Sequence, residues 1–227
     1  LEEWATFCSA LPSSKIEVLM LERIGIGPVA LWTLATSLPA ALTHTCLLNN
    51  PLGEGVNEII KVFEDTPTLR TLCGLTHEET ELDLRFKSLG PGDAKLLAPE
   101  ISVIPSLTKI WVSDNRLGAE GATTLCNALR ESTVTKVQEL GLEGNNIGPE
   151  GAKAVAAMAA IVASVTNILV GGNNLRDEGT IILCAALRGS TVSKVQELGL
   201  SSNGIGPDGA KAVAALCAAI ASVTEVR

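Results

Sequence analysis

The sequence predicts an α/β solenoid in which a short strand and a helix alternate about seven times. The first observation is a segment that the chain contains twice: VQELGLEGNNIGPEGAKAVAA begins at Val137, and VQELGLSSNGIGPDGAKAVAA begins 58 residues later at Val195. The second is that LCNALRESTVTK at Leu125 and LCAALRGSTVSK at Leu183 have the same offset. Self-similarity at a fixed period indicates repeats that stack, because one repeat cannot bury its apolar face alone.

Each of these units contains two copies of a shorter pattern, L-x-L-x-x-N-x-L/I-G. The pattern occurs seven times along the chain, and its closing positions are Gly27, Gly53, Gly90, Gly118, Gly148, Arg176 and Gly206. From the third copy onward the spacings alternate between 28 and 30 residues, which accounts for the longer period.

One copy predicts its elements in order. The alternating apolar residues Leu140 and Leu142 predict a short strand with one buried face. The side-chain amide of Asn145 can satisfy backbone groups where the chain turns out of the strand. The following Gly-Pro-Glu-Gly predicts a turn, since Pro fixes φ and Gly permits positive φ. A helix is then expected over Ala152–Val165, and a polar stretch such as Glu131–Lys136 leads to the next strand.

This pattern resembles the leucine-rich repeat of the ribonuclease-inhibitor-like subclass, and the resemblance covers nearly the whole chain. It implies a horseshoe-shaped solenoid of about seven repeats, with a concave parallel β-sheet and convex α-helices. Proteins of this kind bind other proteins, so the resemblance also favours a binding function over catalysis.

The first three copies depart most from the pattern. Ile24 and Lys87 occupy the Asn position of the first and third copies, and the step from Gly53 to Gly90 is about nine residues too long. We expect an irregular insertion near residues 65–80, as a protruding loop or an extra turn. Because repeats resume in phase at Glu81, residues 1–227 are expected to form a single domain.

Both ends of the chain resemble parts of repeats. Leu1–Leu11 resembles the end of a repeat helix, and Ser222–Arg227 aligns with Ser164–Leu169 at the start of a strand, so the sequence enters an eighth copy. Solenoids need polar terminal caps, and neither end has one. We therefore expect a fragment of a longer array, or ends that rest on a partner.

Bulk composition excludes several classes of function. The net charge is −8 with no run of Lys or Arg, which argues against a nucleic-acid partner. No apolar run reaches the length of a transmembrane segment. Three of the six cysteines, Cys8, Cys126 and Cys184, occupy equivalent helix positions, which predicts reduced packing residues. We expect an intracellular, cytoplasmic protein; an organelle stays open because the N-terminus looks processed or trimmed.

Catalytic residues are scarce. Cys73 and His77 form the one suggestive pair, C-x₃-H, but a Cys–His nucleophile needs hydrogen-bond contact and an orienting group, and a metal needs more ligands. The glycine-rich strings lack the G-K-[ST] of a phosphate loop. We predict no enzyme activity, no catalytic residues, no metal, no cofactor and no small-molecule substrate.

Two surfaces compete as the binding site. On the concave face, the x residues point away from the core because strand side chains alternate between faces. Those of the first four copies are Met20, Glu22, Arg23, Cys46, Leu48, Asn49, Asp83, Arg85, Phe86, Trp111, Ser113 and Asp114. Trp111 is the candidate interface anchor, with Asp83, Arg85, Phe86 and Asp114 around it. Alternatively, Trp111 only lies over its neighbours and shields the sheet.

On the convex face, Trp32 and Ile181 occupy a helix position that holds Lys95, Lys153 and Lys211 in other copies. The predicted helix over Ala152–Val165 also has little polar surface, which suggests cover by a partner; alternatively, Ala simply tolerates exposure.

The leading prediction is a non-catalytic protein-interaction solenoid, a scaffold or subunit of a large multi-subunit complex. The alternative is a regulatory recognition module, such as an inhibitor or sensor region, that binds a protein on its concave face.

Overall fold

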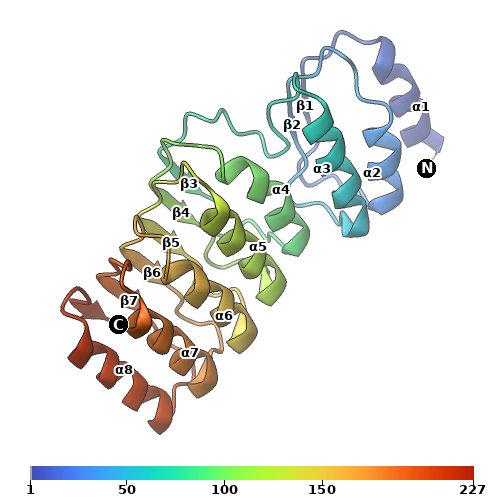
Figure 1. Ribbon diagram of the computed structural model, residues 1–227. Helices are drawn as coiled ribbons and strands as arrows, with labels where there is room; N and C mark the ends of the chain where they lie inside the picture. The colour runs from blue at the N-terminus through green and yellow to red at the C-terminus, as the bar shows by residue number, and fades with distance from the viewer. Residues whose placement is uncertain (1) are drawn as a thin grey trace.

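The computed structural model describes residues 2–227, in which short strands and helices alternate (Figure 1). The strands are β1 (Val18–Met20), β2 (His44–Cys46), β3 (Glu81–Asp83), β4 (Lys109–Trp111), β5 (Glu139–Gly141), β6 (Asn167–Leu169), β7 (Glu197–Gly199) and β8 (Glu225–Val226). The α-helices are α1 (Glu2–Ala10), α2 (Pro28–Ala35), α3 (Val56–Asp65), α4 (Pro91–Ile101), α5 (Gly118–Glu131), α6 (Gly148–Ala159), α7 (Arg176–Gly189) and α8 (Pro207–Ala219), with 3₁₀ turns η1 (Leu11–Ser13) and η2 (Gly53–Gly55). Leu1, part of the helix predicted over 1–11, lies outside the described residues.

The strands form parallel sheets in sequence order. β3 to β8 make one six-stranded sheet and β1 pairs with β2 in a separate two-stranded one. The register is constant, so the same repeat position recurs across the sheet, as in Leu82↔Ile110 and Ile110↔Leu140. Figure 1 shows the helices stacked side by side along one side of the strands. The predicted α/β solenoid, with its concave sheet and convex helices, is therefore confirmed.

Asparagine side chains join one repeat to the next. Asn145 is fully buried, and its Nδ2 donates to the carbonyls of Leu142 (3.0 Å) and Val112 (2.8 Å). Its Oδ1 accepts from the N–H of Leu117 at 3.2 Å. Asn50, Asn115, Asn173 and Asn203 make equivalent bonds. The predicted role of this amide is confirmed, and it satisfies backbone groups that water cannot reach.

The helix predicted over Ala152–Val165 is wrong in its bounds. α6 runs from Gly148 to Ala159. Gly148 has a φ of 59° and Pro149 follows in the first turn of the helix, where its missing N–H costs nothing because that group would have no partner within the helix. The predicted Gly-Pro-Glu-Gly turn is thus the first turn of the helix. The β-branched Ile161 and Val162 lie beyond its end, consistent with their lower helix propensity.

Residues 66–80 separate the two sheets. The sequence predicts a protruding loop or an extra turn here. The segment does not protrude: it folds inward at Leu69–Leu75 and runs beside β2, with isolated bridges His44↔Thr71 and Cys46↔Cys73.

The inward fold overturns the expectation that Cys46 and Leu48 face solvent, since they are 6% and 4% exposed. Gly74 lies over Cys46, because an added Cβ would stand 3.3 Å from the Cys46 Cβ.

Candidate functional site

The five predicted concave residues lie on β3, β4 and the turns that follow them. The sheet register places Asp83 opposite Trp111 and Trp111 opposite Gly141. Asp83, Arg85 and Asp114 are exposed, Trp111 is partly buried, and Phe86 is 74% exposed. We define the concave patch as these five residues: Asp83, Arg85, Phe86, Trp111 and Asp114.

Asp83 and Arg85 hold each other in place. Arg85 Nη2 lies 2.7 Å from Asp83 Oδ2, and Arg85 Nε donates to Asp83 Oδ1 at 2.9 Å. These bonds lower the pKa of Asp83 to about 2, from an ordinary value of 3.8. The pair thus places the Arg85 guanidinium over the Trp111 ring, although in solvent it adds little to stability.

The Trp111 side chain covers Gly141 on the neighbouring strand. An added Cβ on Gly141 would meet Trp111 Cδ1 at 2.8 Å, so only glycine permits this position. The indole Nε1 donates to Glu139 Oε1 at 2.6 Å. Arg85 Cζ and Lys109 Nζ each stand 5.2 Å from the ring centroid, within cation–π range. Trp111 therefore covers part of the sheet and also presents an aromatic ring held by these contacts.

Phe86 has a backbone conformation that does not suit it. Its φ is 58°, in the left-handed region. The equivalent positions of the other repeats also have positive φ and are Arg23, Asn49, Asp114, Gly144, Gly172 and Ser202. Several of these are Gly, Asn or Asp, the residues that adopt this region most easily. A bulky aromatic there is strained, and burial does not compensate for it.

A second row of concave residues was missed from the sequence. Glu81, Lys109 and Glu139 face the same side as Asp83 and Trp111, two residues earlier on each strand, and Lys109 Nζ pairs with Glu81 Oε1 at 2.7 Å. The repeat pattern begins at the first leucine and so excludes this row. Extending the strand alternation by two residues would have found it.

The convex candidates lie on different helices. Trp32 on α2 is 59% exposed and Ile181 on α7 is 40% exposed, so both side chains reach solvent. At the same helix position Lys153 pairs with Glu150, and Lys211 pairs with Asp208 at 2.8 Å. The helix layer is thus charged where Lys occurs and apolar at these two positions.

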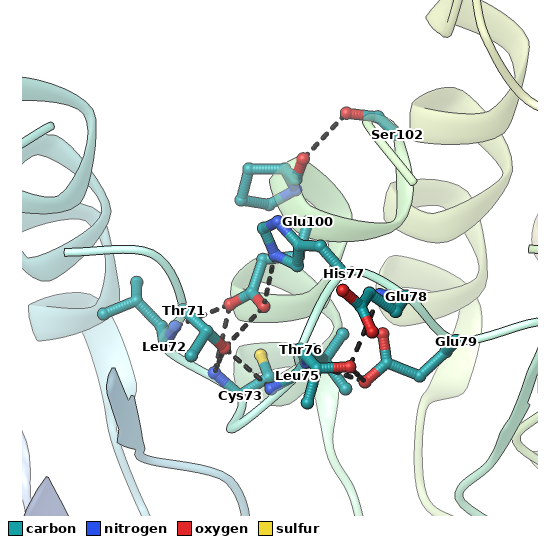
Figure 2. Close-up of polar contacts among 11 residues, drawn as sticks. Thr71, Leu72, Cys73, Leu75, Thr76, His77, Glu78, Glu79, Glu100 and Ser102 are labelled. Atoms are coloured by element: carbon teal, nitrogen blue, oxygen red, sulfur yellow. Dashed lines mark hydrogen bonds and ion pairs between the residues drawn. The ribbon is translucent and has the colours of Figure 1, made fainter. Parts of the chain in front are cut away.

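Cys73 and His77 do not form a catalytic pair. Cys73 is buried, and burial raises the pKa of its thiol well above 9.0. Figure 2 shows the His77 ring turned to Glu100, with Nε2 3.4 Å from Oε2. Within residues 2–227 no hydrogen bond joins His77 to the Cys73 sulfur. The pair therefore lacks both the thiolate and the contact that nucleophilic chemistry requires.

Glu100 explains why this segment folds inward. Its carboxylate is fully buried and accepts from Thr71 Oγ1 (2.7 Å), Leu72 N (2.6 Å) and Cys73 N (3.0 Å) (Figure 2). Three donors on one carboxylate hold the strand-like stretch against α4. This cluster is structural.

Metal ligands, membrane spans and reactive thiols are the remaining candidate features. The described chain contains no group of three or more His, Cys, Asp or Glu side chains placed to hold a metal. From residue 2 onward, no helix is long and apolar enough to cross a membrane.

The packing predicted for Cys126 and Cys184 is confirmed, since both are buried and burial raises their pKa values to about 12 and about 11. Cys217 is exposed on α8.

Comparison with known proteins finds similarity to leucine-rich repeat sequences. A family model described as Leucine Rich repeat matches residues 103–126, 135–156 and 193–214. NACHT, LRR and PYD domains-containing protein 5 of Mus musculus is 29% identical over 199 residues, which is 86% of this chain and 16% of that protein. Ribonuclease inhibitor of Mus musculus is 24% identical over 212 residues, 92% of this chain and 44% of the inhibitor.

This chain thus spans less than half the length of either relative. Among solved structures, Leiomodin-1 Actin-Binding Site 2 has a TM-score of 0.50 at 17% identity, covering 57% of this chain and 75% of that one, a similarity of fold alone. The regular repeats, the inter-repeat asparagines and these relatives agree. The chain thus carries leucine-rich repeats and is related in sequence to ribonuclease inhibitor and to the leucine-rich repeat regions of the NACHT proteins.

Proposed function

We propose that this chain is a non-catalytic recognition module that binds a protein partner through the concave patch. Leucine-rich repeats of this subclass are generally protein-binding modules, and the patch supplies the chemistry that anchors interfaces. The observation that carries the proposal is Phe86: it is 74% exposed and held at a φ of 58°. A bulky residue in this conformation lowers the stability of the fold. An exposed aromatic ring on the same patch as Trp111 and Arg85 can, however, anchor an interface with a partner.

A second candidate is a scaffold or subunit held through the convex face. The exposed Trp32 and Ile181 favour it. We propose an intracellular setting for either function, because the six cysteines of the described chain are free and five of them are buried.

Site-specific photo-crosslinking separates the two candidates even while the partner is unidentified. A photoreactive phenylalanine analogue replaces Phe86 in one variant and Ile181 in a matched one, each expressed in the source cells. We expect a protein adduct from position 86 alone. An adduct from position 181 alone would favour the scaffold, and adducts from neither would contradict both.

A further inference from the structure

A groove of about 1630 Å³ lies where α2, η2, α3 and α4 begin. β2 and β3 belong to separate sheets, so no shared ladder draws α3 and α4 together as it does the later helices. Figure 1 shows α2 and α3 set apart from the closely stacked α4–α8. The break in the sheet therefore leaves room for this groove between α3 and α4.

The α2 wall of this groove is apolar. Val29 and Trp32 line it and are 70% and 59% exposed. α2 has the sequence PVALWTLA, without a charged residue. The first helix packs beside it through Trp4, whose Nε1 donates to the Ala30 carbonyl at 2.8 Å, and leaves Val29 and Trp32 uncovered.

The adjoining wall is acidic. Glu54 on η2 and Glu58 on α3 line the groove, and neither side chain has an ion pair or hydrogen bond within the described chain. η2 lies tightly against the start of α2, since an added Cβ on Gly53 would stand 2.7 Å from Pro28 Cγ. This contact brings Glu54 close to the apolar wall, and Glu58 lines the same groove from α3.

The remaining charges of the groove are mostly satisfied. Lys95 Nζ pairs with Glu120 Oε1 at 2.8 Å. The buried Asp93 accepts from the backbone N–H groups of Gly90 and Asn49. Arg116 contributes the one lining cation for which no carboxylate partner is found in residues 2–227. The uncompensated charge thus changes from negative beside Trp32 to positive at Arg116.

We propose that this groove docks an extended segment of a partner protein that carries a Lys or Arg side chain beside an aliphatic or aromatic residue. The cation stacks on Trp32 and pairs with Glu54 and Glu58, since an indole face and carboxylates both attract it. The neighbouring apolar side chain covers Val29. At the other end Arg116 receives a carbonyl or carboxylate of the segment. This site is independent of the concave patch, and the two can be occupied together.

The test uses a displayed library of random 12-residue peptides selected on the full chain, with the enriched peptides synthesised and measured by calorimetry. We expect enriched peptides to combine a basic with an apolar residue. Trp32→Lys and Glu58→Lys are each expected to weaken binding at least about 30-fold, the loss typical of an interface hot spot. Ile181→Lys, at the Trp32 position of a helix outside the groove, should leave affinity unchanged.

Three outcomes would overturn the proposal: no enrichment, enriched peptides without basic residues, or affinity that survives both groove substitutions. Circular dichroism of the Glu58→Lys variant shows that a loss is not unfolding, because this side chain is exposed. Phe86→Asn should not alter peptide binding. If Phe86→Asn abolishes it, the peptides belong to the concave patch, and the groove proposal fails while the proposed function stands.

Discussion

Phe86 has a left-handed backbone conformation at a repeat position where several other repeats have Gly, Asn or Asp. We predict that Phe86→Asn raises the free energy of unfolding by about 1 kcal/mol, because the left-handed region costs an ordinary residue about 1–2 kcal/mol. Urea denaturation measures the change. Phe86→Leu is the control, since it keeps the strain while removing the ring, and it should give no gain. An Asn variant that is less stable than the native chain would show that the ring supports the fold.

Asp83 and Arg85 make the concave patch sensitive to acid. The pKa of Asp83 is lowered in the folded state, so its pair with Arg85 stabilises the fold above pH 3.8 and is lost as the pH falls toward about 2. We predict that carbon NMR will find the Asp83 carboxyl titrating near the lower value. In Arg85→Ala the midpoint should return toward 3.8. An unchanged midpoint in that variant would rule out Arg85 as the cause.

The cysteines should differ sharply in reactivity. Five are buried, whereas Cys217 lies exposed on α8. We predict that iodoacetamide labels Cys217 rapidly in the native protein, and that Cys126 and Cys184 react only on unfolding, because burial also raises their pKa values. Mass spectrometry of labelled peptides reads this out. Rapid labelling of Cys73 would revive a thiol function for the segment beside Glu100.

Among the elements, the segment over residues 66–80 depends on a single side chain. Glu100→Ala removes the acceptor for Thr71, Leu72 and Cys73. We predict a loss of stability of about 3 kcal/mol, since buried donors without partners cost about 1–3 kcal/mol each. Hydrogen exchange should accelerate over residues 69–75.

Glu150→Ala is the matched control on α6. Its carboxylate pairs with Lys153 on the surface, so its loss should cost less than about 1 kcal/mol. An equal loss of stability in the two variants would show that the buried Glu100 hydrogen bonds stabilise the fold no more than the surface ion pair does.

The regular elements could be predicted from the sequence because each repeat carries its own local pattern, and duplication confirms the period. The path of Leu69–Leu75 could not, since it depends on Glu100, a residue about 30 positions away whose buried role has no local signature. The concave patch was predicted in outline from strand alternation. The strain at Phe86 and the contacts of Lys109 and Glu139 with Trp111 required backbone and side-chain geometry.

At the scale of the whole molecule, the sheet break divides one array into two differently built parts. The six-stranded part presents the concave patch on β3 and β4, and the groove lies where that part meets α2 and α3. Two binding surfaces on one chain suit a recognition module that binds its partner through the concave patch while a second protein segment binds in the groove.

Hydrogen–deuterium exchange of the chain in its partner complex, compared with the isolated chain, tests the central claim most directly. A partner on the concave patch should slow amide exchange at residues 81–86 and 109–114, and leave exchange on the outer faces of α5–α8 unchanged. Protection confined to the convex helices, with 81–86 and 109–114 unaffected, would contradict recognition through the concave face.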